Sequence, residues 1–239
     1  MANVSGDAGS SAPLFPDQKS GVWGQSDTGY GVVGTSLQSS GVQGGSVNGS
    51  GAVGTSTNSN GVTAISGAGN GLYARGGQNA AVLDGKVIIN GMATVQILNI
   101  VGGGDLAEAF TVENDATADP GTVMVIADGA QGTLTVSTKA YDRRVAGVVS
   151  GAEGLESGLT LHQSQASTEA RVALAGMVYC KAEAFSRPIR VGDFLTTSDT
   201  EGCAMAASDT KASRGAILGK AMSELESGRG FVLALVNLQ

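Results

Sequence analysis

The sequence predicts an all-β protein: a repetitive stalk, folded as a triple-stranded β-helix or prism, followed by a compact β-barrel or sandwich head. Three observations lead to this prediction. A glycine followed by an apolar residue recurs every ten residues from Gly21 onward, and 38 of the 239 residues are glycine, whereas only 4% are aromatic. Beyond Asp105 the repeats give way to short apolar segments separated by turn-forming residues. A strict short period is typical of a stacked, quasi-one-dimensional architecture.

Residues 1–20 are predicted to form an irregular N-terminal arm, which contains Pro13 and Pro16 and is a candidate attachment segment. The start of this arm lacks the basic and apolar regions of a secretory signal, so we expect the chain to be made in the cytoplasm. No stretch of about 18 apolar residues is present, so we expect no insertion into a membrane.

Residues 21–91 form the predicted decapeptide-repeat stalk, with the consensus G-V-x-G-x-S-x-x-[GS]-[SNY]. Two glycines in each unit disfavour an α-helix by about 1 kcal/mol each relative to alanine. Turn-forming pairs such as Asn60-Gly61 tolerate positive φ, which leaves about five residues per unit for one short strand. The stretch 81–91 predicts a hairpin around Asp84-Gly85 that caps the stalk.

The repeat also indicates how many chains share one core. One apolar side chain in ten residues cannot form a private core, and a single-chain coil of a β-helix needs roughly 18 residues. Three chains, each supplying one side of a prism, satisfy both conditions. The predicted trimer core is the valine column, defined as Val22, Val32, Val42, Ala52, Val62, Leu72 and Val82. Two alternatives stay open: a monomeric solenoid with two decapeptides per coil, and a flexible Gly/Ser-rich linker.

A neck at residues 92–104 joins the stalk to the head domain at residues 105–239. The neck is apolar and then glycine-rich, which fits either a short strand or a seam between chains. The head begins with a short helical or extended segment at Asp105. Alternating apolar residues predict a set of strands with a weakly patterned surface excursion at 150–170 and a last strand that is fully buried. These strands are expected at 122–127, 133–137, 144–149, 171–181, 189–197, 214–222 and 230–237.

The charge distribution argues against several functions. The net charge is −7, and residues 1–100 carry four acids and three bases, so a net of −6 lies in the other 139 residues. A nucleic-acid-binding protein needs a basic face, which this composition does not supply. The Arg143-Arg144 pair is expected to form salt bridges at the surface rather than an anion site.

No metal or cofactor site is predicted. Cys180 and Cys203 do not have metal-ligand spacing, and His162 is the only histidine. We expect the two cysteines to be small buried side chains and the histidine to lie at the surface. A disulfide between the two cysteines is the alternative. A lone histidine also makes a hydrolase of the Ser-His-Asp or Cys-His type improbable.

The whole arrangement resembles a known family. The decapeptide stalk is similar to the trimeric β-helical shafts of bacteriophage tail fibres and tail spikes, and of related bacterial proteins. The head resembles the domain that follows such shafts through G-D-L-A-E at 104–108, R-V-A-G-V-V-S at 144–150 and G-D-F-L at 192–195. The resemblance implies a homotrimer on the surface of a virion or other particle, with a host-surface glycan or particle protein as a partner.

Some heads of this kind are intramolecular chaperones that cleave themselves from the shaft at a Ser-Asp-x-Ala-Glu motif. On this resemblance Asp105 and Glu108 are the candidate catalytic residues, with Glu108 as a proton carrier. Gly104 stands where the serine would be, so the hydroxyl is missing. The favoured interpretation is that Asp105 and Glu108 form a capping box on a short helix, and that the head stays uncut.

Three functions therefore compete. The favoured one is a structural, trimeric, non-enzymatic fibre or spike protein of a phage or phage-derived particle, whose head acts as a trimerisation clamp or attachment tip. The alternatives are a carbohydrate- or surface-binding module, which the sparse aromatic residues disfavour, and a self-cleaving chaperone head.

Overall fold

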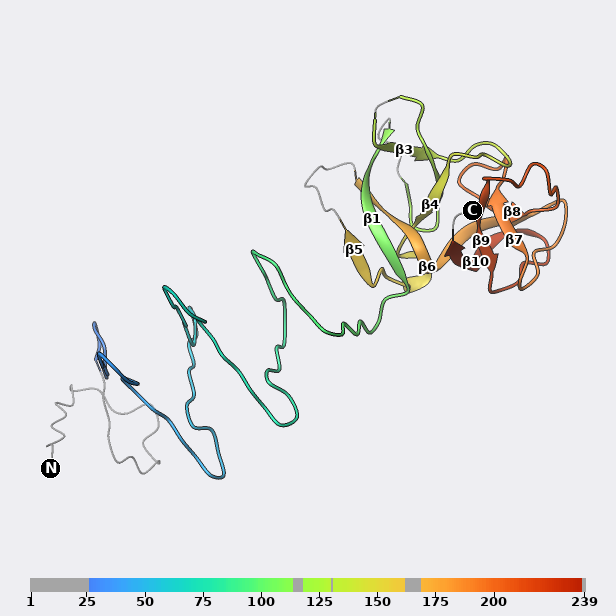
Figure 1. Ribbon diagram of the computed structural model, residues 1–239. Helices are drawn as coiled ribbons and strands as arrows, with labels where there is room; N and C mark the ends of the chain where they lie inside the picture. The colour runs from blue at the N-terminus through green and yellow to red at the C-terminus, as the bar shows by residue number, and fades with distance from the viewer. Residues whose placement is uncertain (1–25, 114–117, 130, 162–168, 238–239) are drawn as a thin grey trace, which may run out of the picture. The chain divides into compact units, whose positions relative to one another are not determined.

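The computed structural model describes residues 26–113, 118–129, 131–161 and 169–237 (Figure 1). The predicted arm and Val22 lie outside the described residues. The chain divides into two units, Met1–Asn90 and Gly91–Gln239, which are treated separately below. The first is called the decapeptide unit.

The decapeptide unit follows the period of the sequence. Bends recur at 27–29, 37–39, 47–49, 57–59 and 67–69, and extended backbone joins them, so the trace folds back and forth in Figure 1. No residue between 26 and 90 belongs to a helix or a paired strand. The predicted hairpin around Asp84-Gly85 is therefore wrong for the single chain. Gly85 does turn the chain, with φ at 112°, but an isolated pair of short strands is only marginally stable in water.

The head is all-β, as predicted. The predicted strands from residue 122 onward all have counterparts, whereas β5 and β8 were not predicted. The start of the head is a strand rather than a helix, so the predicted capping box at Asp105 is wrong. The elements are β1 Asp105–Val112, β2 Val123–Ile126, β3 Thr133–Val136, β4 Val145–Val149, the 3-10 helix η2 Ala152–Gly154, β5 Leu159–Leu161, β6 Glu169–Ala184, β7 Phe194–Thr197, β8 Ala204–Ala206, β9 Ile217–Ala221 and β10 Gly228–Asn237.

The strands close into two small barrels that share β6. In the N-terminal barrel the order β6-β4-β2-β3-β1 returns to β6, and in the C-terminal barrel β6-β10-β9-β7-β8 returns to β6. Figure 1 shows β1, β3 and β4 in one lobe and β7 to β10 in the other. The head is thus neither one barrel nor a sandwich, and closure leaves few free strand edges.

Two hydrophobic cores fill these barrels. Met124, Val149 and Val172 lie in the core of the N-terminal barrel, and their strand neighbours Val123 and Val148 lie in the core of the C-terminal barrel. Because side chains alternate along a strand, β2 and β4 are buried on both faces. All five residues of β4 are buried for this reason.

The chain enters the head beside a kink in β6. β6 pairs with β1 over Glu169–Gly176 and with β10 over Ala175–Ala184, and the register shifts between Leu106 and Ala107 on β1. Gly176 lies in this region with φ at 106°. A Cβ on Gly176 would lie 2.6 Å from the carbonyl oxygen of Gly104 and 2.8 Å from Cα of Asp105, so only glycine fits there.

The C-terminal barrel depends on its buried leucines. We expect Leu218→Ala, at a fully buried position, to lower the free energy of unfolding by about 2–5 kcal/mol, because a cavity is left behind. Urea unfolding of the full chain measures this. Leu161→Ala is the matched control, because Leu161 is 44% exposed, and an equal loss from both variants would contradict the assignment of the core.

Candidate functional site: an assembly surface on the decapeptide unit

The serine at the sixth place of the repeat stabilises each turn. Its Oγ accepts a hydrogen bond from the backbone N–H of the ninth residue, three positions on, in five successive repeats. The pairs are Ser26 with Gly29, Ser36 with Ser39, Ser46 with Gly49, Ser56 with Ser59 and Ser66 with Gly69, at 2.9–3.1 Å. A serine that bonds to the backbone in this way favours a turn over regular structure, which explains why the sixth place is conserved from unit to unit of this chain.

The two glycines of the repeat bring successive units into backbone contact. The glycine at the fourth place faces the glycine at the first place of the next unit. A Cβ on Gly44 would lie 2.2 Å from the carbonyl oxygen of Gly51, and a Cβ on Gly51 would lie 2.8 Å from that of Gly44. The pairs Gly34/Gly41 and Gly54/Gly61 repeat this contact. Glycine at both places is therefore a steric requirement in these three pairs, as close approach of two backbones demands. Ala64 takes the fourth place opposite Gly71, where the backbones lie farther apart, with a Cβ on Gly71 3.0 Å from the carbonyl oxygen of Ala64.

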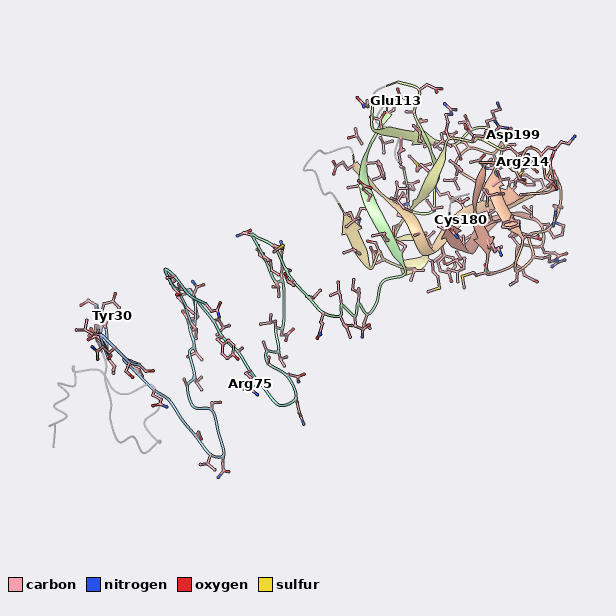
Figure 2. The ribbon with its side chains drawn as sticks, in the orientation of Figure 1. Tyr30, Arg75, Glu113, Cys180, Asp199 and Arg214 are labelled. Atoms are coloured by element: carbon pink, nitrogen blue, oxygen red, sulfur yellow. The ribbon has the colours of Figure 1, made fainter. Side chains whose placement is uncertain are left out.

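The valine column is exposed throughout the described part of the unit. Val32, Val42, Val62, Leu72 and Val82 are between 68 and 81% exposed, and Ala52 is exposed as well. No residue from 26 to 90 is buried. Figure 2 shows the side chains of this unit, with Tyr30 and Arg75 labelled, standing away from the trace. The described part of the decapeptide unit thus has no core of its own, and the trimer core stays a prediction.

The neck continues this apolar exposure into the second unit. Residues 92–104 form no strand, and the apolar side chains along them are all exposed. These are Met92, Val95, Ile97, Leu98, Ile100 and Val101. The interpretation of the neck as a short strand is therefore wrong, and the seam between chains stays a prediction.

Asp105 is a buried acid at the start of β1. It is 6% exposed, Ser150 Oγ donates a hydrogen bond of 2.7 Å to its Oδ2, and its Oδ1 is buried without a hydrogen-bond partner. Burial raises the pKa of Asp105; the Ser150 hydrogen bond and the charge of Arg171 lower it, and the charge of Glu156 raises it. An unsatisfied, desolvated carboxylate opposes folding.

The candidate residues for self-cleavage are not brought together. Asp105 and Glu108 are an odd number of positions apart on β1, so the alternation of the strand places them on opposite faces. A Cβ on Gly104 would lie 2.6 Å from the carbonyl oxygen of Met177, so this position has no room for the serine of the related motif. Gly104 is therefore a packing requirement at the entrance to the head.

The cysteines are buried in the head and free. Burial raises the pKa of Cys180 to about 12, with the nearby Cys203 adding to the shift, and burial also raises the pKa of Cys203. A buried thiol with a raised pKa is unreactive. His162 lies outside the described residues, and among those described no cluster of three His, Cys, Asp or Glu side chains could hold a metal ion.

The predicted salt bridge is confirmed for Arg144. Its Nε and Nη2 donate to the two carboxylate oxygens of Asp142 at 3.1 and 2.7 Å, and Nη1 contacts Asp128. This hydrogen bonding holds the pKa of Asp142 below its usual value. Arg144 is therefore engaged within the head.

One surface was missed because the last strand was expected to be fully buried. Val232, Ala234 and Val236 of β10 are indeed buried, but Phe231 and Leu235 are 40 and 43% exposed. In a continuously apolar strand the alternation of hydrophobic and polar residues, which normally marks the outer face, is missing. The sequence held no signal that this face reaches solvent.

No protein-family model matches the sequence, and no curated protein matches it. Three solved chains match the structure, among them the N base of the head fibre protein gp8.5 of bacteriophage phi29. That match has 13% sequence identity and a TM-score of 0.30, and it covers 56% of this chain and 90% of the other. A TM-score of this size does not establish a common fold. Within the residues described, no helix has the length and apolarity to cross a membrane.

The glycine contact gives a test with neighbouring residues. We expect Gly44→Ala to disrupt the decapeptide unit, because its Cβ would overlap the backbone at Gly51, and to lower the midpoint of thermal unfolding of the stalk. Gly45→Ala is the matched control, because a Cβ there meets nothing within 4 Å. Equal effects of the two substitutions on circular dichroism melting would show that the backbones do not approach at Gly44.

Asp105 predicts a dependence of stability on pH. Burial raises the pKa of Asp105 in the folded state. The buried carboxyl group therefore does not destabilise the fold below the pKa of the unfolded chain, about 3.9, and its destabilising effect grows as the pH rises toward the folded-state pKa. We therefore expect Asp105→Asn to raise the free energy of unfolding at pH 7 and to leave it nearly unchanged below about pH 4. Urea unfolding at both pH values measures the difference, with Glu108→Gln on the opposite face as the control. A gain of equal size at both pH values would contradict the assignment.

Proposed function

We propose that this chain is a structural, trimeric fibre or spike protein in which three decapeptide units share one core. The observation that supports the proposal most directly is the valine column: a regularly spaced set of apolar side chains, exposed along residues 26–90, none of which is buried. Exposed apolar surface of this extent marks an interaction site in a soluble protein. A regular period of ten favours a partner with the same period, which is another copy of the chain.

The energetics favour a collective assembly. Full burial of a valine or leucine side chain contributes about 1.5–3 kcal/mol, and each column residue gains this only when its partners are present. The glycine contacts and serine turns set the spacing at which the column residues recur. Such a stalk gains stability from neighbouring layers, as repeat proteins do.

The particle and the role of the head are proposed from the sequence resemblance. The shaft and head resemble phage tail-fibre and tail-spike proteins, so we place the chain on the surface of a virion or phage-derived particle. The head would act as a trimerisation clamp or attachment tip, with a host-surface glycan or a particle protein as its partner. No enzymatic activity, nucleic-acid binding or membrane insertion is proposed.

The proposal is tested first by the solution mass. Light scattering on a size-exclusion column should give three full-length chains, with the mass of the intact chain measured alongside. A monomer would overturn the shared core and favour a single-chain solenoid. A fragment beginning at Asp105 would revive self-cleavage.

A pair of adjacent substitutions tests the column itself. We expect Val42→Asp to dissociate the stalk, because three carboxylates would meet in the shared core, and this should appear as a lower mass or a lower melting temperature. Gln43→Asp introduces the same charge at a place that the prism model directs outward, so it should leave assembly unchanged. Equal loss of assembly from both variants would refute the prism.

A further inference from the structure

We propose that the three heads of the assembly contact one another through the outer face of β6 and β10. This inference rests on the proposed trimer and adds a second interface to it. The face is called the β6–β10 face and consists of Met177, Tyr179 and Lys181 on β6, Phe231, Leu233 and Leu235 on β10, and Met222 after β9.

The strand register makes these side chains one continuous surface. Leu235 pairs with Met177, Leu233 with Tyr179, and Phe231 with Lys181. Their neighbours along each strand point into the C-terminal barrel, where Val178 and Val232 are fully buried. The backbone N–H of Met222 donates to the carbonyl oxygen of Leu233 at 2.7 Å, which extends the surface to β9. The β6–β10 face is therefore held by a rigid, fully paired sheet.

The exposure and composition of this face suit a protein interface. Met177, Phe231, Leu235 and Met222 are each 40–43% exposed. Aromatic residues and methionine are enriched in the centres of interfaces, and a contiguous apolar patch marks an interaction site. The interior of the C-terminal barrel lies on the other side of these strands. Phe231 packs at the margin of the face, where a Cβ on Gly121 would lie 2.6 Å from its ring, whereas Met177, Leu235 and Met222 keep 40–43% of their surface exposed.

Charge favours a second copy of this chain as the occupant. Residues 101–239 carry a net charge of −6, so heads held side by side repel one another over most of their surface. The β6–β10 face contains no acid and includes Lys181, with Asp119 at its rim, 3.7 Å from the Lys181 amine. The acid-free face is where like-charged heads approach with least repulsion.

The position of the face also favours a second copy. The backbone N–H of Met177 donates to the carbonyl oxygen of Gly104 at 2.8 Å, so the chain passes from the neck into the head at the edge of this face. Ile100 of the neck lines a shallow, open depression together with Gly104 and Gly176. If three necks meet at a common axis, this end of β6 is the part of each head that lies nearest to the axis.

Methionine oxidation tests the interface in the full-length protein. Peroxide converts exposed methionine to the sulfoxide, and peptide mass spectrometry gives the rate at each site. The reference is Ile126→Met, which introduces a methionine on β2 at a position that is 53% exposed and lies outside the β6–β10 face. We expect Met177 to be oxidised roughly tenfold more slowly than the reference methionine. A rate of this size means that the interface exposes Met177 to peroxide for less than about a tenth of the time.

A second variant connects the protection to the contact between copies. Leu235→Glu places a carboxylate in the face of each head, and we expect it to return Met177 to the reference rate while light scattering still gives three chains. Ile126→Glu is the matched control and should leave Met177 protected. Far-UV circular dichroism checks that each variant is folded.

The outcomes separate the two proposals. A trimer in which Met177 is oxidised at the reference rate overturns the head interface and leaves the shared stalk standing. A monomer overturns the proposed function and, with it, the interface. Protection of Met177 that persists in a folded Leu235→Glu variant shows that a contact within one chain shields it, which also overturns the interface.

Discussion

The constraint that governs this protein is that its repeat offers only one column side chain for burial in every ten residues. A chain of this composition gains too little from its own packing to offset the entropy of ordering its backbone. The structure of the decapeptide unit shows what the sequence can settle alone: turns closed by serine hydroxyls, and glycines that let one unit touch the next. Neither device buries Val42 or its equivalents. Successive units thus touch through their backbones, while the column side chains stay exposed in the single chain, as the proposed trimer requires.

The head, unlike the decapeptide unit, buries its apolar side chains within one chain. Its two barrels share β6, and each strand of either barrel finds partners on both sides around the closed ring. Sharing one long strand lets β2 and β4 be buried on both faces, so two small cores support each other. The head thus buries its own cores within one chain, whereas no described residue of the decapeptide unit is buried. The boundary between the two regimes lies at Gly103 and Gly104, where a Cβ would overlap the backbone of Gly158 or Met177.

How far the sequence could predict these features depends on how local each one is. The ten-residue period and the need for small residues followed from single units, because glycine and serine act within a few residues of themselves. Most strands of the head were predictable for the same reason. Closure into two barrels was not, since it depends on short pairings between segments distant in the sequence: β1 pairs with β3 over two residues, and β8, three residues long, pairs with β6 at one. Of the two conformations predicted at Asp105, the extended one is confirmed and the capped helix is wrong, because pairing with β6 and β5 outweighed a local capping pattern. The exposed side of β10 failed because an apolar strand gives no period by which to separate its faces.

The repeats alone do not fix the register in which three stalks would align, but a contact between heads would. Consecutive units are alike, so three stalks could align with one chain displaced by ten residues and lose only one layer of the core. Departures from the consensus, such as Ala52 and Ala64, penalise that displacement only weakly, because they change the volume of a layer by a few atoms. The head occurs once in the chain, and a contact through the β6–β10 face would align three copies at one point, next to the neck. Displacing a chain by ten residues would then break a whole interface instead of one layer. In the proposed trimer, a repetitive stalk that can slip and a head that occurs once per chain are therefore compatible, because the proposed contact between heads would fix the register that the repeats leave open.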